Sequence, residues 1–223
     1  MRKEYHFEEI TSTQDYAKKL SLDNQSEFLV YSDIQTRGRG RFGRSWDAPK
    51  GGLWFSFDEK LNERNCVFTL MVGVAVREVL EEKYNYKVQL KWPNDLIAEN
   101  KKVGGVICEK VNENVIVGIG INTNNSEIGV DKATNFFKIT GTKANNYDIM
   151  TSIISRLEEL TNAKDYEIIK KFRENMAFKE RKCYVSALGS EAIIKDITNN
   201  GELIVETDTG IKNVIAGEIN VCI

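Results

Sequence analysis

Apolar residues recur along the chain with two different spacings. The stretch from Cys66 to Lys83 is apolar on most faces before it becomes charged, which predicts a buried helix. Residues 147–160 carry apolar side chains at helical spacing, namely Ile149, Ile153, Leu157 and Leu160. Residues 165–176 predict another helix, and one more begins at Ser12, where Asp15 follows three residues later as in a capping box.

Shorter apolar runs separated by polar turns predict strands. They cover residues 27–32, 52–57, 88–92, 102–110 and 114–120. Because the last three follow one another closely, we expect neighbouring strands of one sheet. Residues 122–146 are polar and contain glycines, which predicts a long loop.

The pattern changes after Lys179. Short strands are predicted at residues 182–187, 191–197, 202–208 and 211–216, and Asn200-Gly201 is a strong hairpin signal. This spacing is typical of a small all-β barrel. The expected organisation is therefore a larger α+β domain over residues 1–179 and a small β-barrel domain over residues 180–223.

The composition of the chain limits the classes of function and site that it can have. A net charge of −2 argues against a general nucleic-acid binder, and no apolar run is long enough to span a membrane. The cysteines at 66, 108, 183 and 222 form no CxxC pair, which favours buried free thiols in a reducing cytoplasm. His6 is the single histidine, so histidine catalysis and a protein-held metal site are not expected.

The stretch RGRGRFGRSW, residues 37–46, alternates arginines with glycines and ends in Trp46. Glycines let backbone N–H groups approach a ligand, and guanidinium groups match phosphate or carboxylate oxygens. Trp46 offers a flat face to a base or an apolar ring. From composition alone, a solvated basic loop or an RNA contact explains this stretch equally well.

Three other motifs are weaker evidence of a functional site when each is considered alone. KWPNDL, residues 91–96, predicts a tight turn that either presents Asp95 to a cleft or is only a corner. Lys102 precedes a strand with paired glycines, which allow a ligand to approach, although most exposed lysines are simply solvated. GIGIN, residues 118–122, lacks the third glycine and the following helix of a dinucleotide fingerprint, so a Rossmann fold is rejected.

Taken together and in order, these motifs resemble the biotin protein ligases. The resemblance includes Ser12-Thr13-Gln14, Gln35, GRGRFGRSW, KWPNDL, KKVGGVICE and GIGIN, and extends to AGEI near the C-terminus. It implies an α+β catalytic domain of the class II synthetase type, with a mixed sheet backed by helices, followed by a barrel similar to Src-homology-3 domains. It also implies a reaction in which biotin and Mg-ATP form biotinyl-adenylate, and a lysine of a biotin carboxyl carrier protein then receives biotin.

The resemblance assigns roles by matching position. Residues implied in biotin binding are Ser12, Thr13, Gln35, Gly38, Arg39, Gly40, Arg41, Lys102 and Gly105. Residues implied in ATP binding are Arg41, Arg44, Trp46, Lys102 and Asn122. Residues implied in catalysis are Lys102, Arg41 and Asp95, with Asp95 orienting Lys102 or helping the acceptor amine lose its proton.

Two positions depart from the family pattern. Gln14 stands where the family usually has asparagine, and Arg37 replaces a small residue. Because the Ser-Thr motif begins at residue 12, we expect no DNA-binding domain before it and no nucleic-acid partner. A cytoplasmic enzyme without a membrane partner is expected, and a homodimer is left open. The alternatives are a lipoate ligase or octanoyl transferase, an RNA-binding module, and a pantothenate- or biotin-sensing protein.

Overall fold

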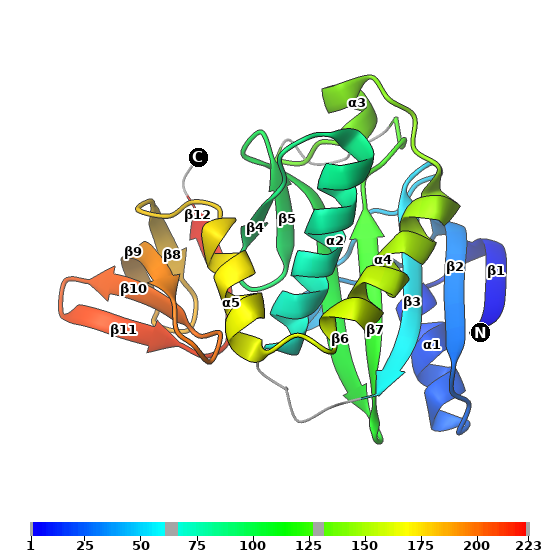
Figure 1. The fold of residues 1–223 in the computed structure, drawn as a ribbon, viewed down its shortest axis with the longest axis horizontal. Coiled ribbons are helices and arrows are strands. Elements are labelled where there is room, and N and C mark those ends of the chain that lie inside the picture. The colour runs from blue at the N-terminus through cyan, green and yellow to red at the C-terminus, as the bar shows by residue number, and fades with distance from the viewer. Residues whose placement is uncertain (1, 61–66, 127–131, 222–223) are drawn as a thin grey trace. The chain divides into compact units, whose positions relative to one another are not determined.

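The computed structural model describes residues 2–60, 67–126 and 132–221, and the chain forms two compact units. Unit 1 consists of residues 1–63 and 101–152, and unit 2 of residues 64–100 and 153–223. Figure 1 shows the elements of both units. The sequence predictions at Cys66 and Cys222 lie outside the described residues.

Unit 1 is built on a mixed sheet with the strand order β1-β2-β3-β7-β6. These strands are β1 (Lys3–Ile10), β2 (Phe28–Gln35), β3 (Leu53–Lys60), β7 (Asn114–Ile121) and β6 (Lys101–Val111). β1 pairs with β2 in parallel, and the other neighbours pair antiparallel. The predicted strands at 27–32, 52–57, 102–110 and 114–120 are confirmed as β2, β3, β6 and β7.

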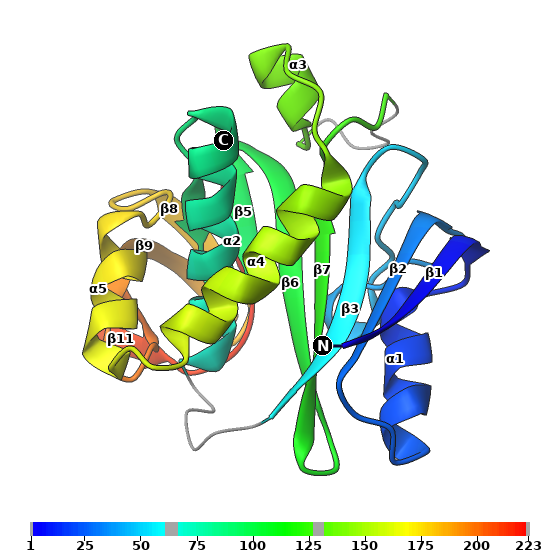
Figure 2. The same ribbon diagram turned by 45° about the vertical axis from the view of Figure 1, so that its right-hand side comes forward.

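Helix α1 (Thr13–Leu22) packs on one face of this sheet, and Figure 2 shows it beside β2 and β3. The helix begins where the sequence predicted, since the Ser12 side chain accepts a hydrogen bond from the Asp15 N–H at 3.3 Å. Its apolar side bears Ala17 and Leu20, which join a buried cluster with Phe28 and other sheet residues. This cluster holds α1 against the sheet.

Among the elements of unit 1, β1 and a helix in the loop after β7 were not predicted. β1 is an edge strand with largely exposed, charged side chains, so its sequence lacks the apolar pattern that marks buried strands. Within the predicted loop of residues 122–146, residues 136–140 form a short helix, α3 (Phe136–Thr140). The Asn135 side chain caps α3 by accepting the Lys138 N–H at 2.7 Å, and Gly141 ends it at φ 68°.

Unit 2 contains α2 (Phe68–Tyr84), which confirms the predicted buried helix, and the hairpin of β4 (Gln89–Lys91) and β5 (Asp95–Ala98). The turn of this hairpin has a cis peptide bond between Trp92 and Pro93. The Trp92 indole N–H donates to the Gly201 carbonyl at 2.9 Å, so this turn is tied to the C-terminal part of the chain.

The predicted helices at 147–160 and 165–176 are confirmed as α4 (Asn146–Leu160) and α5 (Asp165–Glu174). The apolar stripe of α4 is buried, as its spacing predicted, at Ile149, Ile153, Leu157 and Leu160. α5 packs on α2 within unit 2. None of the helices in the described parts of the chain is long and apolar enough to cross a membrane.

The C-terminal strands form a separate antiparallel sheet in the order β11-β10-β9-β8-β12. They are β8 (Lys182–Val185), β9 (Ser190–Ile197), β10 (Leu203–Thr207), β11 (Gly210–Val214) and β12 (Ile219–Val221). The turn between β9 and β10 contains Gly201 at φ 82°, as the Asn200-Gly201 signal predicted. The α+β fold class is therefore confirmed, whereas the domain division after Lys179 stays a prediction.

Candidate active site

A row of glycines leaves part of the unit 1 sheet without side chains. In the strand register Trp54 lies opposite Gly120, and Gly120 lies opposite Gly105. Two residues further along β3, Ser56 lies opposite Gly118. Residues directly opposite each other point to the same face, so Gly105, Gly118 and Gly120 form an open floor on the face that carries α1. We call these three residues the glycine floor.

Neighbouring groups approach this floor closely. A Cβ atom at Gly118 would lie 2.4 Å from Gln14 Oε1, and one at Gly120 would lie 2.9 Å from Trp46 Nε1. Side chains at these positions would therefore displace α1 and Trp46. Glycine at every second strand residue is the sequence signal of such a floor. β7 runs through both glycines of GIGIN as a strand, in agreement with the rejected Rossmann fold, but the role of these glycines as a floor was not predicted.

The start of α1 brings polar groups to the edge of the floor. Gln35, at the end of β2, accepts hydrogen bonds through Oε1 from the Thr13 backbone N–H at 2.8 Å and from Thr13 Oγ1 at 3.1 Å. Thr13 Oγ1 also lies 2.9 Å from Ser56 Oγ on β3. Ser12 and Thr13 are both buried. The structure thus brings together Ser12, Thr13 and Gln35, three of the predicted biotin-binding residues.

The arginine-rich stretch folds back on itself as a compact loop. The Trp46 N–H donates to the Gly38 carbonyl at 2.8 Å, and the Gly40 N–H donates to the Arg44 carbonyl at 2.7 Å. A Cβ atom at Gly38 would lie 2.3 Å from the Trp46 carbonyl oxygen, so only glycine allows this close return. These backbone contacts hold the predicted site residues between Gly38 and Trp46 together in one compact loop.

Side chains at the tip of the loop lie toward solvent. Phe42 is 70% exposed and has a positive φ of 55°. The Arg41 guanidinium lies 4.9 Å from the centre of the Phe42 ring. Arg44 is exposed just after this turn. The tip thus carries cationic groups that an anionic ligand can reach.

The base of the loop is anchored by charge. Arg39 forms an ion pair with Asp15 in the first turn of α1, and its Nη2 lies 3.7 Å from Glu109 Oε1 on β6. The hydrogen bond that Arg39 donates to Asp15 and the charges of the nearby carboxylates raise the pKa of the Arg39 guanidinium, against the opposing effect of burial. Arg39 is therefore held as a cation beside α1.

Lys102 and Trp46 lie together at the start of β6. Lys102 Nζ is 5.0 Å from the centre of the Trp46 ring, within the range of a cation–π interaction. Trp46 also meets Trp54 edge to face, with 6.3 Å between the ring centres. Among the described residues, the buried Trp46 Nε1 has no hydrogen-bond acceptor. These contacts place a lysine, an indole ring and the glycine floor at one end of the sheet.

Asn122 follows β7 and is buried. Its Nδ2 donates to the Thr134 carbonyl at 3.1 Å, and its Oδ1 accepts from Asn125 Nδ2 at 3.4 Å. These bonds hold the segment that leads to α3. Its predicted nucleotide contact stays a prediction.

Asp95 belongs to unit 2, at the first position of β5. Lys91 Nζ lies 3.5 Å from its Oδ2 across the hairpin turn. The predicted influence of Asp95 on Lys102 stays a prediction.

Other polar residues border the floor: Gln14 is known from the sequence only as a departure from the family pattern, whereas Lys18 and Glu109 were not predicted. Gln14 donates through Nε2 to Glu109 at 2.9 Å and to the Ile116 carbonyl at 3.2 Å. Lys18 donates to Glu109 at 3.0 Å. The available signal was the position of Glu109, four residues after Gly105 on the same strand and therefore on the same face.

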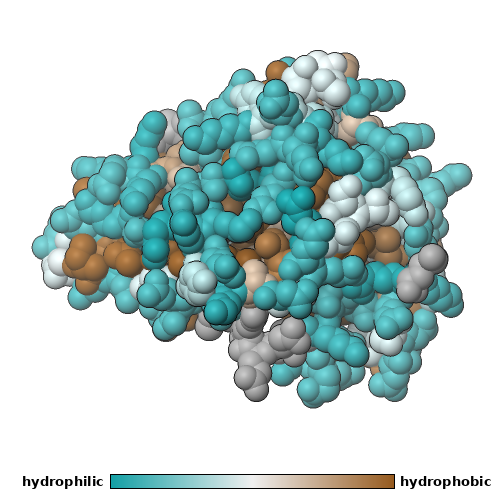
Figure 3. Space-filling view, viewed as in Figure 1, coloured by the Kyte–Doolittle hydropathy of each residue, from teal (hydrophilic) through white to brown (hydrophobic). Residues whose placement is uncertain are grey.

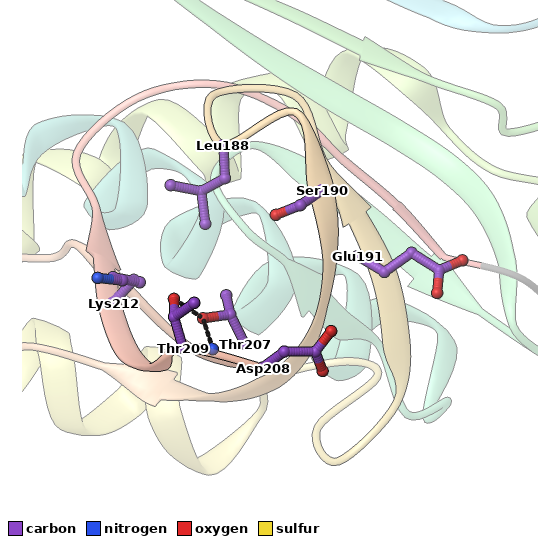
Figure 4. A pocket seen from close by; sticks show the side chains of 7 residues that line it. All are labelled: Leu188, Ser190, Glu191, Thr207, Asp208, Thr209 and Lys212. Carbon is purple, nitrogen blue, oxygen red and sulfur yellow. Dashed lines mark hydrogen bonds between the residues drawn. The ribbon is translucent and has the colours of Figure 1, made fainter.

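The described part of unit 2 contains another hollow, of about 290 Å³, on the C-terminal sheet (Figure 4). It is lined by Leu188, Ser190, Glu191, Thr207, Asp208, Thr209 and Lys212. Exposed apolar residues, Ile211 and Ile215, occur in the same sheet region, and Figure 3 shows hydrophobic atoms gathered over the β10–β11 hairpin. None of the predicted site residues lines this hollow. Among the described residues, no three His, Cys, Asp or Glu side chains are grouped as metal ligands.

Comparison with known proteins agrees with this geometry. The model of the biotin/lipoate A/B protein ligase family matches residues 6–124, which contain the glycine floor and the arginine loop. The chain belongs to this family. The model of the biotin protein ligase C-terminal domain matches residues 189–221, within the second sheet. The resemblance to biotin protein ligases, predicted from the motifs, is confirmed.

Individual relatives match either nearly the whole chain or about half of it. The bifunctional ligase/repressor BirA of Bacillus subtilis is 31% identical over 96% of this chain and 72% of its own length. Biotin–protein ligase 2 of Arabidopsis thaliana is 38% identical over 53% of this chain and 40% of its own. The biotin protein ligase of Aquifex aeolicus, solved in complex with biotin and ATP, matches with a TM-score of 0.89 and 30% identity, covering 100% of this chain and 99% of that one.

Proposed function

We propose that this chain is a biotin protein ligase, which activates biotin with ATP and transfers it to a lysine of a carrier protein. The observation that carries the proposal is the meeting of the glycine floor, the Thr13–Gln35 pair and the Lys102–Trp46 pair in one unit of the family's fold. The family model alone includes lipoate ligases, but the match to the biotin protein ligase C-terminal domain favours biotin.

Biotin has a flat ring system with a polar ureido group, an apolar chain and a carboxylate. The glycine floor has no side chains of its own, and Gln14 and Trp46, which lie close to Gly118 and Gly120, would border the rings. Ser12, Thr13 and Gln35 provide hydroxyl and amide groups for the ureido group, and Gly105 provides backbone contact. We infer that the loop residues Gly38, Arg39, Gly40 and Arg41 cover the bound ligand.

The first step joins two anions. A biotin carboxylate oxygen attacks the α-phosphorus of ATP, the bond from this phosphorus to the α,β-bridging oxygen breaks, pyrophosphate leaves, and biotinyl-adenylate forms. Fixed cations stabilise the charge that develops in such a transition state. In our proposal Lys102 bridges the carboxylate and the α-phosphate, Arg41 and Arg44 contact phosphate oxygens, and Trp46 packs on adenine.

In the second step, the neutral amine of the carrier lysine attacks the carbonyl carbon of biotinyl-adenylate. The bond to AMP breaks, an amide forms, and the amine loses a proton. We propose that Asp95 orients Lys102 or helps to remove this proton, and that Asn122 contacts the nucleotide. Neither step requires a protein nucleophile or a histidine.

The acceptor in this proposal is a biotin carboxyl carrier protein or domain. One relative, from Mycobacterium tuberculosis, is named biotin–[acetyl-CoA-carboxylase] ligase. Mg²⁺ would enter as the counter-ion of ATP, because proteins commonly hold it through substrate phosphates and few side chains. The cytoplasmic location, the homodimer and the lack of nucleic-acid binding stay predictions, and the Bacillus subtilis relative is named a ligase and repressor.

The test is incubation of the chain with biotin and α-labelled ATP, followed by detection of labelled biotinyl-adenylate and of biotin on a carrier domain. Parallel reactions contain lipoate, or a carrier whose acceptor lysine is replaced by arginine. We expect adenylate only with biotin, and transfer only to the intact carrier. Activity with lipoate and none with biotin would contradict the proposal.

Lys102→Ala tests the assignment within the site, with the exposed neighbour Lys101→Ala as the matched control. Loss of one charge-assisted transition-state contact slows a reaction roughly a hundredfold to a thousandfold. We expect this loss in adenylate formation, while transfer from presynthesised biotinyl-adenylate is largely retained. Lys102→Arg should rescue the first step only in part. Normal adenylation with failed transfer would assign Lys102 to the second step.

A further inference from the structure

Glu109 on β6 connects three segments of the chain around the glycine floor. Its Oε2 accepts from Gln14 Nε2 at 2.9 Å, and its Oε1 accepts from Lys18 Nζ at 3.0 Å and lies 3.7 Å from Arg39 Nη2. The Glu109 side chain is only 28% exposed. Burial alone would raise its pKa, but the hydrogen bonds from Gln14 and Lys18 and the nearby cations outweigh burial and lower it.

The carboxylate fixes the orientation of the Gln14 amide. Nε2 faces two groups that can only accept, Glu109 Oε2 and the Ile116 carbonyl, so this end must be the NH₂ group. Oε1 consequently points at the floor beside Gly118. It is buried, and among the described residues it has no hydrogen-bond donor. Glu109 thus determines which end of this amide faces the site.

The same carboxylate helps to hold the arginine loop. Arg39 at the base of the loop is anchored between Asp15 on α1 and Glu109 on β6. The bonds within the loop, between Gly38 and Trp46 and between Gly40 and Arg44, hold its shape but do not connect it to α1. The ion pairs of Arg39 therefore provide a direct connection between the loop and the helix that borders the floor.

We propose that Glu109 is a positioning residue: through Gln14 and Arg39 it keeps α1 and the arginine loop in register over the floor, so that the loop retains biotinyl-adenylate until transfer. This inference rests on the proposed function. Glu109 acts through other side chains, so its loss should speed release of the adenylate far more than it slows the chemical step.

Glu109→Gln is the most direct test, because glutamine keeps an acceptor for Gln14 but removes the charge that faces Lys18 and Arg39. The matched control is Glu113→Gln, which removes the same charge from the exposed turn between β6 and β7. Asp15→Asn removes the other carboxylate partner of Arg39 at a more exposed position. All variants are made in the full chain, and their folding is checked by circular dichroism.

Two rates are measured: formation of biotinyl-adenylate at saturating biotin and ATP, and release of prebound labelled biotinyl-adenylate after addition of excess unlabelled compound. Weakening a charge-assisted contact should raise the release rate about tenfold in Glu109→Gln and by a smaller factor in Asp15→Asn. Formation should change less than about threefold, and Glu113→Gln should match the wild type in both rates. A purely structural role would reduce the active fraction without changing the release rate of the folded fraction.

A release rate within about twofold of wild type in folded Glu109→Gln would overturn the proposal, as would slower formation with unchanged release. If Glu109→Gln does not fold, Asp15→Asn decides: faster release supports the proposal, and wild-type release overturns it. A wild-type chain that forms no biotinyl-adenylate from biotin and ATP would overturn the proposed function and this inference together. That outcome is visible in the formation assay before any variant is compared.

Discussion

Gly118→Ala is the substitution whose effect follows most directly from the geometry of the floor. The new Cβ atom would lie 2.4 Å from Gln14 Oε1 and 3.3 Å from Ser56 Oγ. Ordinary contact distances are about 3.5 Å, so Oε1 must retreat by roughly 1 Å. Gln14 cannot retreat freely, because it is buried and its Nε2 is bonded to Glu109 and to the Ile116 carbonyl.

The cost can be estimated from these contacts. Overpacking a buried site costs about 1–3 kcal/mol, and weakening a hydrogen bond to a charged group costs a further ~1.5 kcal/mol. Replacing glycine in a strand returns about 0.5–1 kcal/mol of chain entropy. We expect the free energy of unfolding to fall by about 1.5–4 kcal/mol, which corresponds to a melting temperature lower by roughly 3–16 °C.

Denaturant and thermal unfolding of Gly118→Ala, Gln14→Ala and the double variant measure this effect. Because Gln14→Ala removes the clashing oxygen, the double variant should lose at least about 1 kcal/mol less stability than the sum of the single variants. Gly73→Ala is the control: its new Cβ atom would meet only Leu90 Cδ2 at 3.5 Å inside α2, so it should stabilise by about 0.5–1 kcal/mol. Wild-type stability of Gly118→Ala, or simple additivity with Gln14→Ala, would refute the reasoning.

Three further outcomes are expected. Asp58→Ala should lower the free energy of unfolding by about 3–5 kcal/mol in denaturant titrations. This buried carboxylate accepts hydrogen bonds from two backbone N–H groups at the start of β2, each at 2.8 Å, and both N–H groups would lose their acceptor. Burial would raise the pKa of Glu78, but hydrogen bonds and charge from Lys171 and Arg156 hold this pKa below its usual value. The Glu78 carboxylate therefore stabilises unit 2 above pH ~4.3, and this contribution is lost as the pH falls through the folded-state pKa. Glu78→Gln should abolish this part of the pH dependence of stability. Trp46→Ala should raise the Michaelis constant for ATP about tenfold or more with little change for biotin, and an equal loss of both affinities in calorimetry would place the ring elsewhere.

Local sequence was sufficient for most elements and for the family. The helical spacing of α4, the Ser12 cap of α1 and the Asn200-Gly201 turn depend on residues close together in the chain, so their signals can be read directly. The order of the short motifs, from Ser12-Thr13 through GRGRFGRSW to the Lys102 strand, is sufficient to indicate the ligase family without any tertiary contact. β1 was not predicted, because a strand at the exposed edge of the sheet does not need alternating apolar residues.

Only the tertiary structure decided how the site is assembled. The glycine floor depends on the register of β6 against β7, which places Gly105 opposite Gly120 and aligns glycines from two separate motifs. The bond from Gln14 to Glu109 joins residues 95 positions apart, and the pairing of Arg39 with Glu109 depends on how the loop returns across α1. The motifs determine which chemical groups are present. Strand register and burial depend on the packing of the whole sheet, because the stability of each strand pairing depends on the apolar surface that it buries against residues distant in the sequence.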